Sequence, residues 1–236
     1  MKQSFAEKVI YFNTHLEFSD PLPDGYRVMN PFLENPETLM VMKEFYEEFY
    51  SDQNGRKFIL GINPSRHGAG VTGVPFTDTK RLESVCGIKM KSAHTHEVSS
   101  VFIYDMISEY GGAKAFYRDF YINSPFPLAI THHSKTNWLN SNYYDDMNLF
   151  ESVRPFMIET IKKHIRLGLD TSTVFILGKK NARFIEKINT ECKFFDNMIV
   201  MEHPRYIQQY KSKEKQVYID KYLMAFNGIK NSEESI

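Results

Sequence analysis

Two asparagines and a histidine stand at or directly behind short apolar segments of the sequence. Asn63 follows KFILGI, Asn123 follows FYI, and His203 comes two residues after MIVM. A carboxamide can orient a water molecule or read the polar edge of a ring, but it is no strong base. A histidine can donate a hydrogen bond to a developing negative charge. Taken singly, each of these residues can be explained without a function. Asn63 and Asn123 can be turn residues, and His203 can be a partly buried histidine whose hydrogen bonds are all made within the protein.

Segments of strand length alternate with helical patterns and would position these side chains. Strands are expected at 57–62, 120–122, 173–177 and 198–201, and helices at 4–18, 36–51, 97–110, 145–167 and 180–190. This alternation predicts an α/β fold, a mainly parallel sheet of about four strands with helices on both faces. Ligands of such sheets bind beyond the carboxyl ends of the strands, so Asn63, Asn123, Gly178 and His203 are expected on one rim. The pattern does not give the strand order, so their adjacency is an assumption.

Length and composition bound the organisation of the chain. The 236 residues contain no long linker or repeat and predict a single domain over 1–236. Within it we expect an N-terminal helical extension over 1–50, a structured loop over 19–35 and a polar tail over 227–236. We find no signal peptide and no apolar run of membrane length, so a cytoplasmic monomer that does not contact membranes is expected.

The net charge and the spacing of cysteines and histidines argue against a protein that coats nucleic acid and against a metal site. The formal net charge is zero, unlike that of proteins that coat nucleic acid, although a local patch suffices to hold a few phosphates. Cys86 and Cys192 lie far apart, and the histidines lack partners at ligand spacing. We therefore expect no cofactor and no metal.

The segment GINPSRHGAGVTGVPF, residues 61–76, contains the pattern GxGxxG at Gly68, Gly70 and Gly73. A dinucleotide site is excluded because Asn-Pro-Ser-Arg-His separates the strand from the first glycine, and the residues that follow open a helix poorly. A phosphate-binding P-loop is excluded because no Gly-Lys-Ser/Thr closes the segment. The notable features of the segment are therefore Asn63, which Pro64 holds at the end of a strand, and Phe76, which ends the sequence TGVPF.

Together these segments resemble the uracil-DNA glycosylase superfamily, and within it the SMUG-type, single-strand-selective monofunctional branch. That branch has a first motif close to GMNPGPFGMAQTGVPF and a second that begins HPSPR; the counterparts here are GINPSRHGAGVTGVPF and HPRY. NSPFPLAI, the later SKTN and FILGKKNARFIEK extend the resemblance over residues 57–210. The branch with Gly-Gln-Asp-Pro-Tyr has Asp at the position of Asn63, the mismatch-specific branch lacks the histidine, and the iron-sulfur branches need more cysteines. A SMUG relative remains, similar to the divergent group of Bacteroidota.

The resemblance implies a monofunctional DNA glycosylase of base excision repair, which hydrolyses the N-glycosidic bond of uracil in single- or double-stranded DNA and leaves an abasic site. It makes Asn63 and His203 catalytic, with Asn63 orienting the water and His203 donating to uracil O2. Phe76 would stack on the extruded base and Asn123 would read it, in a pocket shaped by Gly61, Ile62 and Gly73. The residues expected to contact DNA are Ser65, Ser134, Lys135, Gly178, Lys179, Arg205 and Tyr206.

Two departures from the family pattern keep alternatives open. Ser65 stands where the family has glycine, and the second motif is shortened to His-Pro-Arg, so either Arg205 or Tyr206 would fill the gap in the DNA stack. These changes would also suit a glycosylase for xanthine or hypoxanthine. The neutral net charge would suit a module that binds single-stranded nucleic acid without cleaving it. The cluster of Lys179, Lys180 and Arg183 can also be an ordinary solvent-exposed face of a helix with no role in binding DNA.

Overall fold

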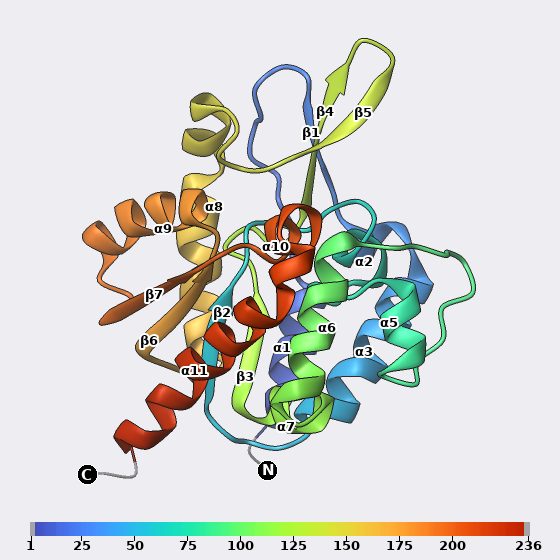
Figure 1. The fold of residues 1–236 in the computed structure, drawn as a ribbon. Coiled ribbons are helices and arrows are strands. Elements are labelled where there is room, and N and C mark those ends of the chain that lie inside the picture. The colour runs from blue at the N-terminus through green and yellow to red at the C-terminus, as the bar shows by residue number, and fades with distance from the viewer. Residues whose placement is uncertain (1–2, 234–236) are drawn as a thin grey trace.

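The computed structural model describes residues 3–233, in which a parallel four-stranded sheet carries helices on both faces (Figure 1). The strand order is β3 (Phe120–Asn123), β2 (Arg56–Leu60), β6 (Leu169–Leu177) and β7 (Asn197–Met201). Each neighbouring pair is parallel. The predicted fold class is confirmed, and the parallel order places the carboxyl ends of all four strands along one edge.

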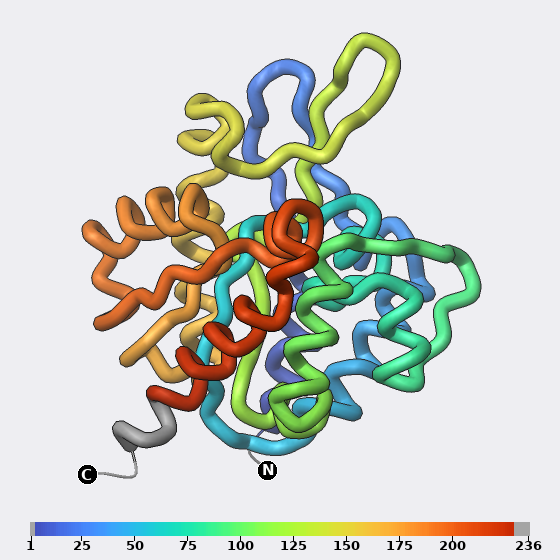
Figure 2. The backbone as a smooth tube through the Cα atoms, in the orientation of Figure 1, coloured from blue at the N-terminus to red at the C-terminus, as the bar shows by residue number. Residues whose placement is uncertain are grey.

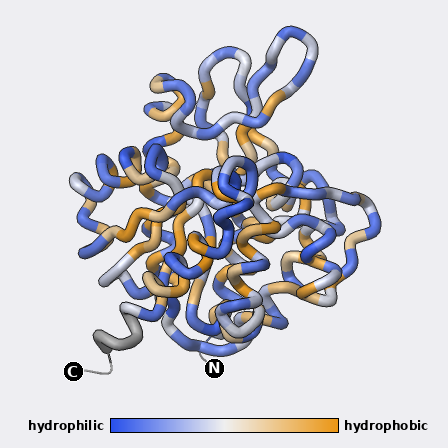
Figure 3. The backbone as a smooth tube through the Cα atoms, in the orientation of Figure 1, coloured by the Kyte–Doolittle hydropathy of each residue, from blue (hydrophilic) through white to orange (hydrophobic). Residues whose placement is uncertain are grey.

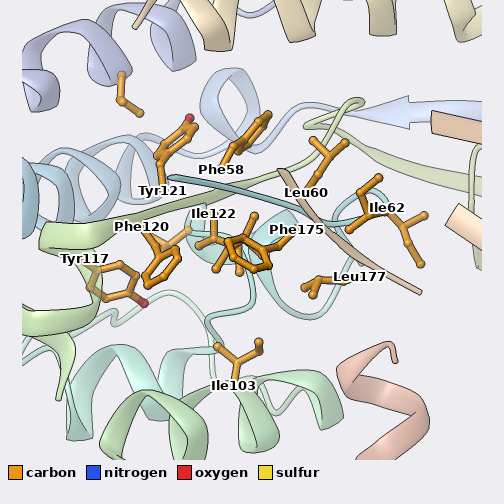
Figure 4. Packing of buried hydrophobic residues seen from close by; sticks show 14 of the residues in the cluster. Phe58, Leu60, Ile62, Ile103, Tyr117, Phe120, Tyr121, Ile122, Phe175 and Leu177 are labelled. Carbon is orange, nitrogen blue, oxygen red and sulfur yellow. The ribbon is translucent and has the colours of Figure 1, made fainter. Parts of the chain in front are cut away.

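Alternating side chains of the sheet bury two apolar layers (Figure 4). On one face, His164 of α8 (Met147–Arg166) has its ring 5.4 Å from that of Phe58 and 4.6 Å from that of Phe12 in α1 (Phe5–Thr14). On the other face, α6 (Val98–Tyr110), α7 (Ala113–Asp119) and α11 (Lys215–Glu233) pack, and the ring of Phe226 lies 4.5 Å from that of Phe120. The sheet is therefore rigidly enclosed, which suits a rim that must hold side chains in place.

The N-terminal helices contribute to this core. In α3 (Pro36–Tyr50), Asn35 caps the first turn and Pro36 occupies its first position. Arg56 is 1% exposed, and its guanidinium lies 4.6 Å from the ring centroids of Phe5 and Tyr50. Its charge is compensated by Asp52 at 2.9 Å. Helix α1 ends at Thr14, four residues before the predicted boundary at 18.

A second, antiparallel sheet projects from the molecule, at the top of Figures 1 and 2. It is formed by β1 (Tyr26–Met29), β4 (Ala129–Ser134) and β5 (Asn137–Ser141) in the order β1-β4-β5. The prediction of a loop over 19–35 is wrong here, because this segment contains β1 and the short helix α2 (Pro31–Glu34). Strand β1 forms by pairing with residues a hundred positions later, as in Tyr26 opposite His132, and such long-range pairing leaves no local signal.

The C-terminal part contains α9 (Lys179–Cys192), α10 (Pro204–Tyr210), a 3₁₀ turn (Ser212–Glu214) and α11. The polar tail predicted for 227–236 is helical up to Glu233, and residues 234–236 lie outside the described part of the chain. In Figure 3 hydrophobic segments are most frequent in the middle of the molecule, and the loops that project at the top are mostly hydrophilic or intermediate. Among residues 3–233 there is no helix long and apolar enough to cross a membrane.

Candidate active site

A cavity of about 800 Å³ lies at the carboxyl edge of the parallel sheet. It brings together residues from loops that follow β2, β6 and β7, as expected for an open sheet of this kind. The predicted site residues that line it are Ile62, Asn63, Ser65, Phe76, Gly178, Lys179, His203, Arg205 and Tyr206. Further lining residues that the sequence did not suggest include Glu97, Ser99, Ser124, Tyr144, Gln209 and Tyr210.

Asn63 is half-buried, and its amide is held by the chain between β5 and α8. The Nδ2 group donates to the carbonyl of Ser141 at 3.0 Å, and Oδ1 accepts from the N–H of Tyr143 at 3.1 Å. These two bonds fix which end of the amide is the oxygen. Oδ1 keeps a second lone pair, which can accept a hydrogen bond from a water molecule.

His203 immediately precedes the first turn of α10, and one hydrogen bond determines which ring nitrogen carries the proton. Its Nδ1 accepts the backbone N–H of Arg205 at 3.2 Å, so Nδ1 carries no proton and the neutral ring carries its proton on Nε2. Burial lowers the pKa of His203 to about 4, and the charge of Arg205 acts in the same direction. The neutral tautomer that can donate from Nε2 is therefore the stable form at neutral pH.

Phe76 adopts a left-handed backbone conformation with φ of 54°. A residue other than glycine reaches this region at a cost, and functional sites are where such a cost is commonly found. The ring packs on Gly61, where an added Cβ would lie 2.9 Å from Cε2 of Phe76. Its centroid is 5.9 Å from that of His203. Gly73, with φ of 70°, ends the short helix α4 (Ala69–Thr72) and turns the chain toward Phe76 without lining the cavity.

Asn123 is 3% exposed and does not line the cavity, whereas the adjacent Ser124 does. Its Oδ1 accepts from the N–H of Ser124 at 2.8 Å, and its Nδ2 donates to the hydroxyl of Tyr121 at 2.6 Å. The orientation of this amide is therefore determined by two buried partners.

A directional chain of hydrogen bonds continues from Asn123 to His164. The Nε2 of His164 lies 3.3 Å from the carbonyl of Ser124, which only accepts, so the proton is on Nε2. Nδ1 then accepts from the hydroxyl of Tyr121 at 3.3 Å, which leaves the Tyr121 oxygen to accept from Asn123. Burial lowers the pKa of His164 to about 3, which keeps the ring neutral.

The N-terminus of α9 opens on the cavity with no side chain capping it. Its boundary residue Gly178 has φ of 101°, and an added Cβ would lie 3.4 Å from that of His203. Free N–H groups at the start of a helix bind anions such as phosphate. Lys179 lies beside them, 77% exposed, with its Nζ 3.6 Å from a carboxylate oxygen of Glu202.

The structure places two predicted DNA contacts away from the cavity. Ser134 and Lys135 lie at the turn between β4 and β5, at the tip of the projecting sheet, and Lys135 has φ of 42°. The resemblance had grouped them with Gly178 and Lys179, which line the cavity.

Asn181 is a buried residue that no sequence pattern singled out. Its Nδ2 donates to the carbonyls of Gly61 at 3.0 Å and Leu177 at 3.2 Å, and its Oδ1 accepts from the hydroxyl of Tyr143. It thereby ties the ends of β2 and β6 to the segment that holds Asn63. Within residues 3–233, no group of three or more His, Cys, Asp or Glu residues is arranged to hold a metal ion.

The chain is similar to known proteins in both sequence and fold. The family model described as "Uracil DNA glycosylase superfamily" matches residues 48–227. The crystal structure of wild-type Pedobacter heparinus SMUG2 is 48% identical in sequence, with a TM-score of 0.95, and the match covers 98% of this chain and 100% of that one. No curated protein matches the sequence. The match to SMUG2 includes the N-terminal helices, which the family model leaves out.

Proposed function

The chain belongs to the uracil DNA glycosylase superfamily, as a SMUG-like DNA glycosylase that hydrolyses N-glycosyl bonds, and we propose that its substrate is uracil in DNA. The observation that carries the proposal is the hydrogen bond from the N–H of Arg205 to Nδ1 of His203, which leaves the proton of the neutral ring on Nε2, at the wall of a cavity that Asn63 also lines. The product would be an abasic site in an otherwise intact strand.

His203 stabilises the leaving group in this proposal. Water adds to C1′ while the C1′–N1 bond breaks, and the bonding electrons leave with uracil as an anion. The attacking water leaves its oxygen and one hydrogen on C1′ as a hydroxyl and releases its other proton to solvent. The Nε2–H of His203 donates a hydrogen bond to O2, where negative charge develops. A donor already in place needs no reorganisation during the reaction, and one such bond contributes about 100- to 1,000-fold in rate.

Asn63 orients the attacking water through the free lone pair of Oδ1. Because a carboxamide cannot take up the proton, the rate should be lower than with a carboxylate at this position. The bonds to Ser141 and Tyr143 prevent the amide from turning its N–H groups toward the water.

Recognition of the base is assigned to Phe76 and Asn123. The ring of Phe76 stacks on the extruded base. The Asn123 amide does not line the cavity, and we propose that it comes to pair with O4 and N3–H when the base is bound, an arrangement that cytosine reverses at both atoms. The chain of hydrogen bonds through Tyr121 to His164 holds that amide in the orientation that selects uracil. Ser124 lines the cavity and is the alternative reader, so Asn123→Ala and Ser124→Ala separate the two.

DNA would be held at the N-terminus of α9 and along α10. Tyr206 and Tyr210 are 44% and 67% exposed, and their rings lie 5.7 Å apart on the side of α10 that lines the cavity. Exposed aromatic rings stack on unpaired bases, and extruding a base from single-stranded DNA costs less than from a duplex. We therefore propose a preference for single strands and mismatches, and action as a monomer, since the whole cavity is built by a single chain.

The test is release of uracil from a single-stranded oligonucleotide and from its duplex, with enzyme in excess. Strand cleavage that appears only after alkali supports a monofunctional enzyme. Borohydride trapping of a covalent complex would instead indicate a lyase step through a lysine.

A second substrate class is favoured by the size and lining of the cavity. Ser65 stands where the family pattern has glycine, and a volume of about 800 Å³ leaves room for a bicyclic base. Oligonucleotides with uracil, xanthine or hypoxanthine at the same position decide between the bases. Faster release of either purine would make it the preferred substrate.

A further inference from the structure

Glu97 lies on the wall of the cavity and has no role in the reaction described above. It immediately precedes α6, yet its carboxylate caps none of the N–H groups of that helix. Its Oε1 instead accepts from the hydroxyls of Ser65 at 3.1 Å and Ser99 at 3.4 Å. Within the described part of the chain, its buried Oε2 has no hydrogen-bond partner.

The carboxyl group is also closely packed. A Cβ added to Gly68 would lie 2.0 Å from Oε2 and 2.5 Å from Cδ, so any other residue at 68 would displace the carboxylate from this position. Burial raises the pKa of Glu97 to about 7, and the charge of Asp78 also raises it, while hydrogen bonds from Ser65 and Ser99 and the charge of Arg205 lower it. An acid kept in such surroundings costs stability, and such costs recur at functional sites.

Ser65 connects this acid to the segment that carries Asn63. Its hydroxyl donates to Glu97 and accepts from the N–H groups of His67 at 3.3 Å and Gly68 at 3.2 Å. The donor and both lone pairs of the hydroxyl are thus used. Only Pro64, whose ring restricts the backbone, separates Ser65 from Asn63. A displacement of Ser65 is therefore transmitted to Asn63.

We propose that Glu97 is a positioning residue for the glycosylase reaction: bound to Ser65, it holds residues 63–68 in the conformation from which Asn63 orients the attacking water. The segment is then anchored on two sides, by Glu97 through Ser65 and by Ser141 and Tyr143 through Asn63 itself. The inference rests on the proposed role of Asn63.

A double-mutant cycle tests this link. Wild type, Glu97→Ala, Ser65→Ala and the double variant are compared in single-turnover release of whichever base the wild type releases fastest. Glu97→Ala is expected to lower the maximal rate constant by about 10- to 100-fold, the effect of a misplaced reacting group. The half-saturating enzyme concentration should stay within about twofold, because binding is unaffected. The double variant should be no slower than the slower single variant, because both changes remove the same link.

Glu97→Gln separates the hydrogen bond from the charge, since its amide oxygen still accepts from Ser65. It is expected to recover most of the rate. A double variant whose loss equals the product of the single losses overturns the proposal, as does a Glu97→Gln variant as slow as Glu97→Ala. Melting temperatures identify any general loss of folding, and Glu83→Ala, an exposed carboxylate on α5 (Thr79–Ser84) outside the cavity, is the matched control.

The substrate proposal and this inference fail separately. If the wild type releases xanthine or hypoxanthine but no uracil, the uracil assignment is wrong, and the cycle is read on the base that is released.

Discussion

Replacing Tyr121 with Phe removes a single oxygen from the chain of hydrogen bonds that fixes Asn123. The hydroxyl accepts from Nδ2 of Asn123 at 2.6 Å and donates to Nδ1 of His164 at 3.3 Å. Without it, the amide retains only the bond from the N–H of Ser124 to Oδ1. In the wild type, turning the Asn123 amide end for end breaks two hydrogen bonds, whereas in Tyr121→Phe it breaks only the one from Ser124.

The expected magnitude follows from the value of one buried hydrogen bond. Leaving a buried polar group unpaired costs about 1–3 kcal/mol, which corresponds to about 5- to 150-fold in an equilibrium. If Asn123 reads uracil, Tyr121→Phe should raise the population of the reversed amide relative to the productive one by this factor, while the bond from Ser124 still favours the productive orientation. The ratio of the uracil rate to any cytosine rate should therefore fall by about 5- to 150-fold, with only a small loss in the uracil rate itself.

The assay is single-turnover release from oligonucleotides that carry uracil or cytosine at the same position. Tyr117→Phe is the matched control, because it also deletes a fully buried hydroxyl, which bonds to Tyr104 at 3.3 Å and lies outside the chain. A uracil-to-cytosine ratio in Tyr121→Phe equal to that of the wild type would refute the reasoning, and so would an equal fall of this ratio in Tyr117→Phe.

Three further predictions concern stability and DNA binding. Burial lowers the pKa of His164 to about 3 from an ordinary 6.5, so the unfolded state binds this proton at a higher pH than the folded state does. The free energy of unfolding, measured with urea, should therefore fall as the pH drops below 6.5. In His164→Leu the slope of this free energy against pH should decrease by about one proton. Lys179→Ala should weaken binding to DNA of any sequence and reduce the slope of log K against log salt concentration by about one. Lys135→Ala, at the tip of the projecting sheet, should change this slope less. Equal changes in the two variants would contradict the placement of the phosphate site at α9. Tyr206→Ala should weaken single-strand binding by about 1–3 kcal/mol in fluorescence titrations, and unchanged affinity would remove the stacking role.

The sequence predicted the parallel sheet because its strands are buried on both faces and appear as continuous apolar runs, such as KFILGI at 57–62 and TVFIL at 173–177. The residues at their carboxyl ends could then be assigned to one rim by a general rule of such sheets. The projecting sheet could not be predicted, since β1 and β5 are short and exist only through pairing with β4. The helix over 227–233 was not predicted because this segment is largely polar; it continues α11, whose earlier part buries Ile219, Tyr222 and Phe226.

Most of the predicted site residues line the cavity, but the motifs do not reveal the network of hydrogen bonds that supports it. Glu97 and Asn181 act through contacts across 32 and 120 positions of the chain, with Ser65 and Gly61, and spacing cannot reveal such contacts. The orientation of the Asn123 amide also depends on packing, because Tyr121, which accepts its hydrogen bond, is itself bound to His164 of α8, 43 positions later in the chain.

The central claim is that Asn63 and His203 act together on a uracil base. The direct measurement is uracil release from a single-stranded oligonucleotide by the wild type, Asn63→Ala and His203→Ala, each checked for an unchanged melting temperature. The account predicts release by the wild type and a loss of about 100-fold or more in each variant. Release at the wild-type rate by either folded variant, or none by the wild type with enzyme in excess, would contradict it.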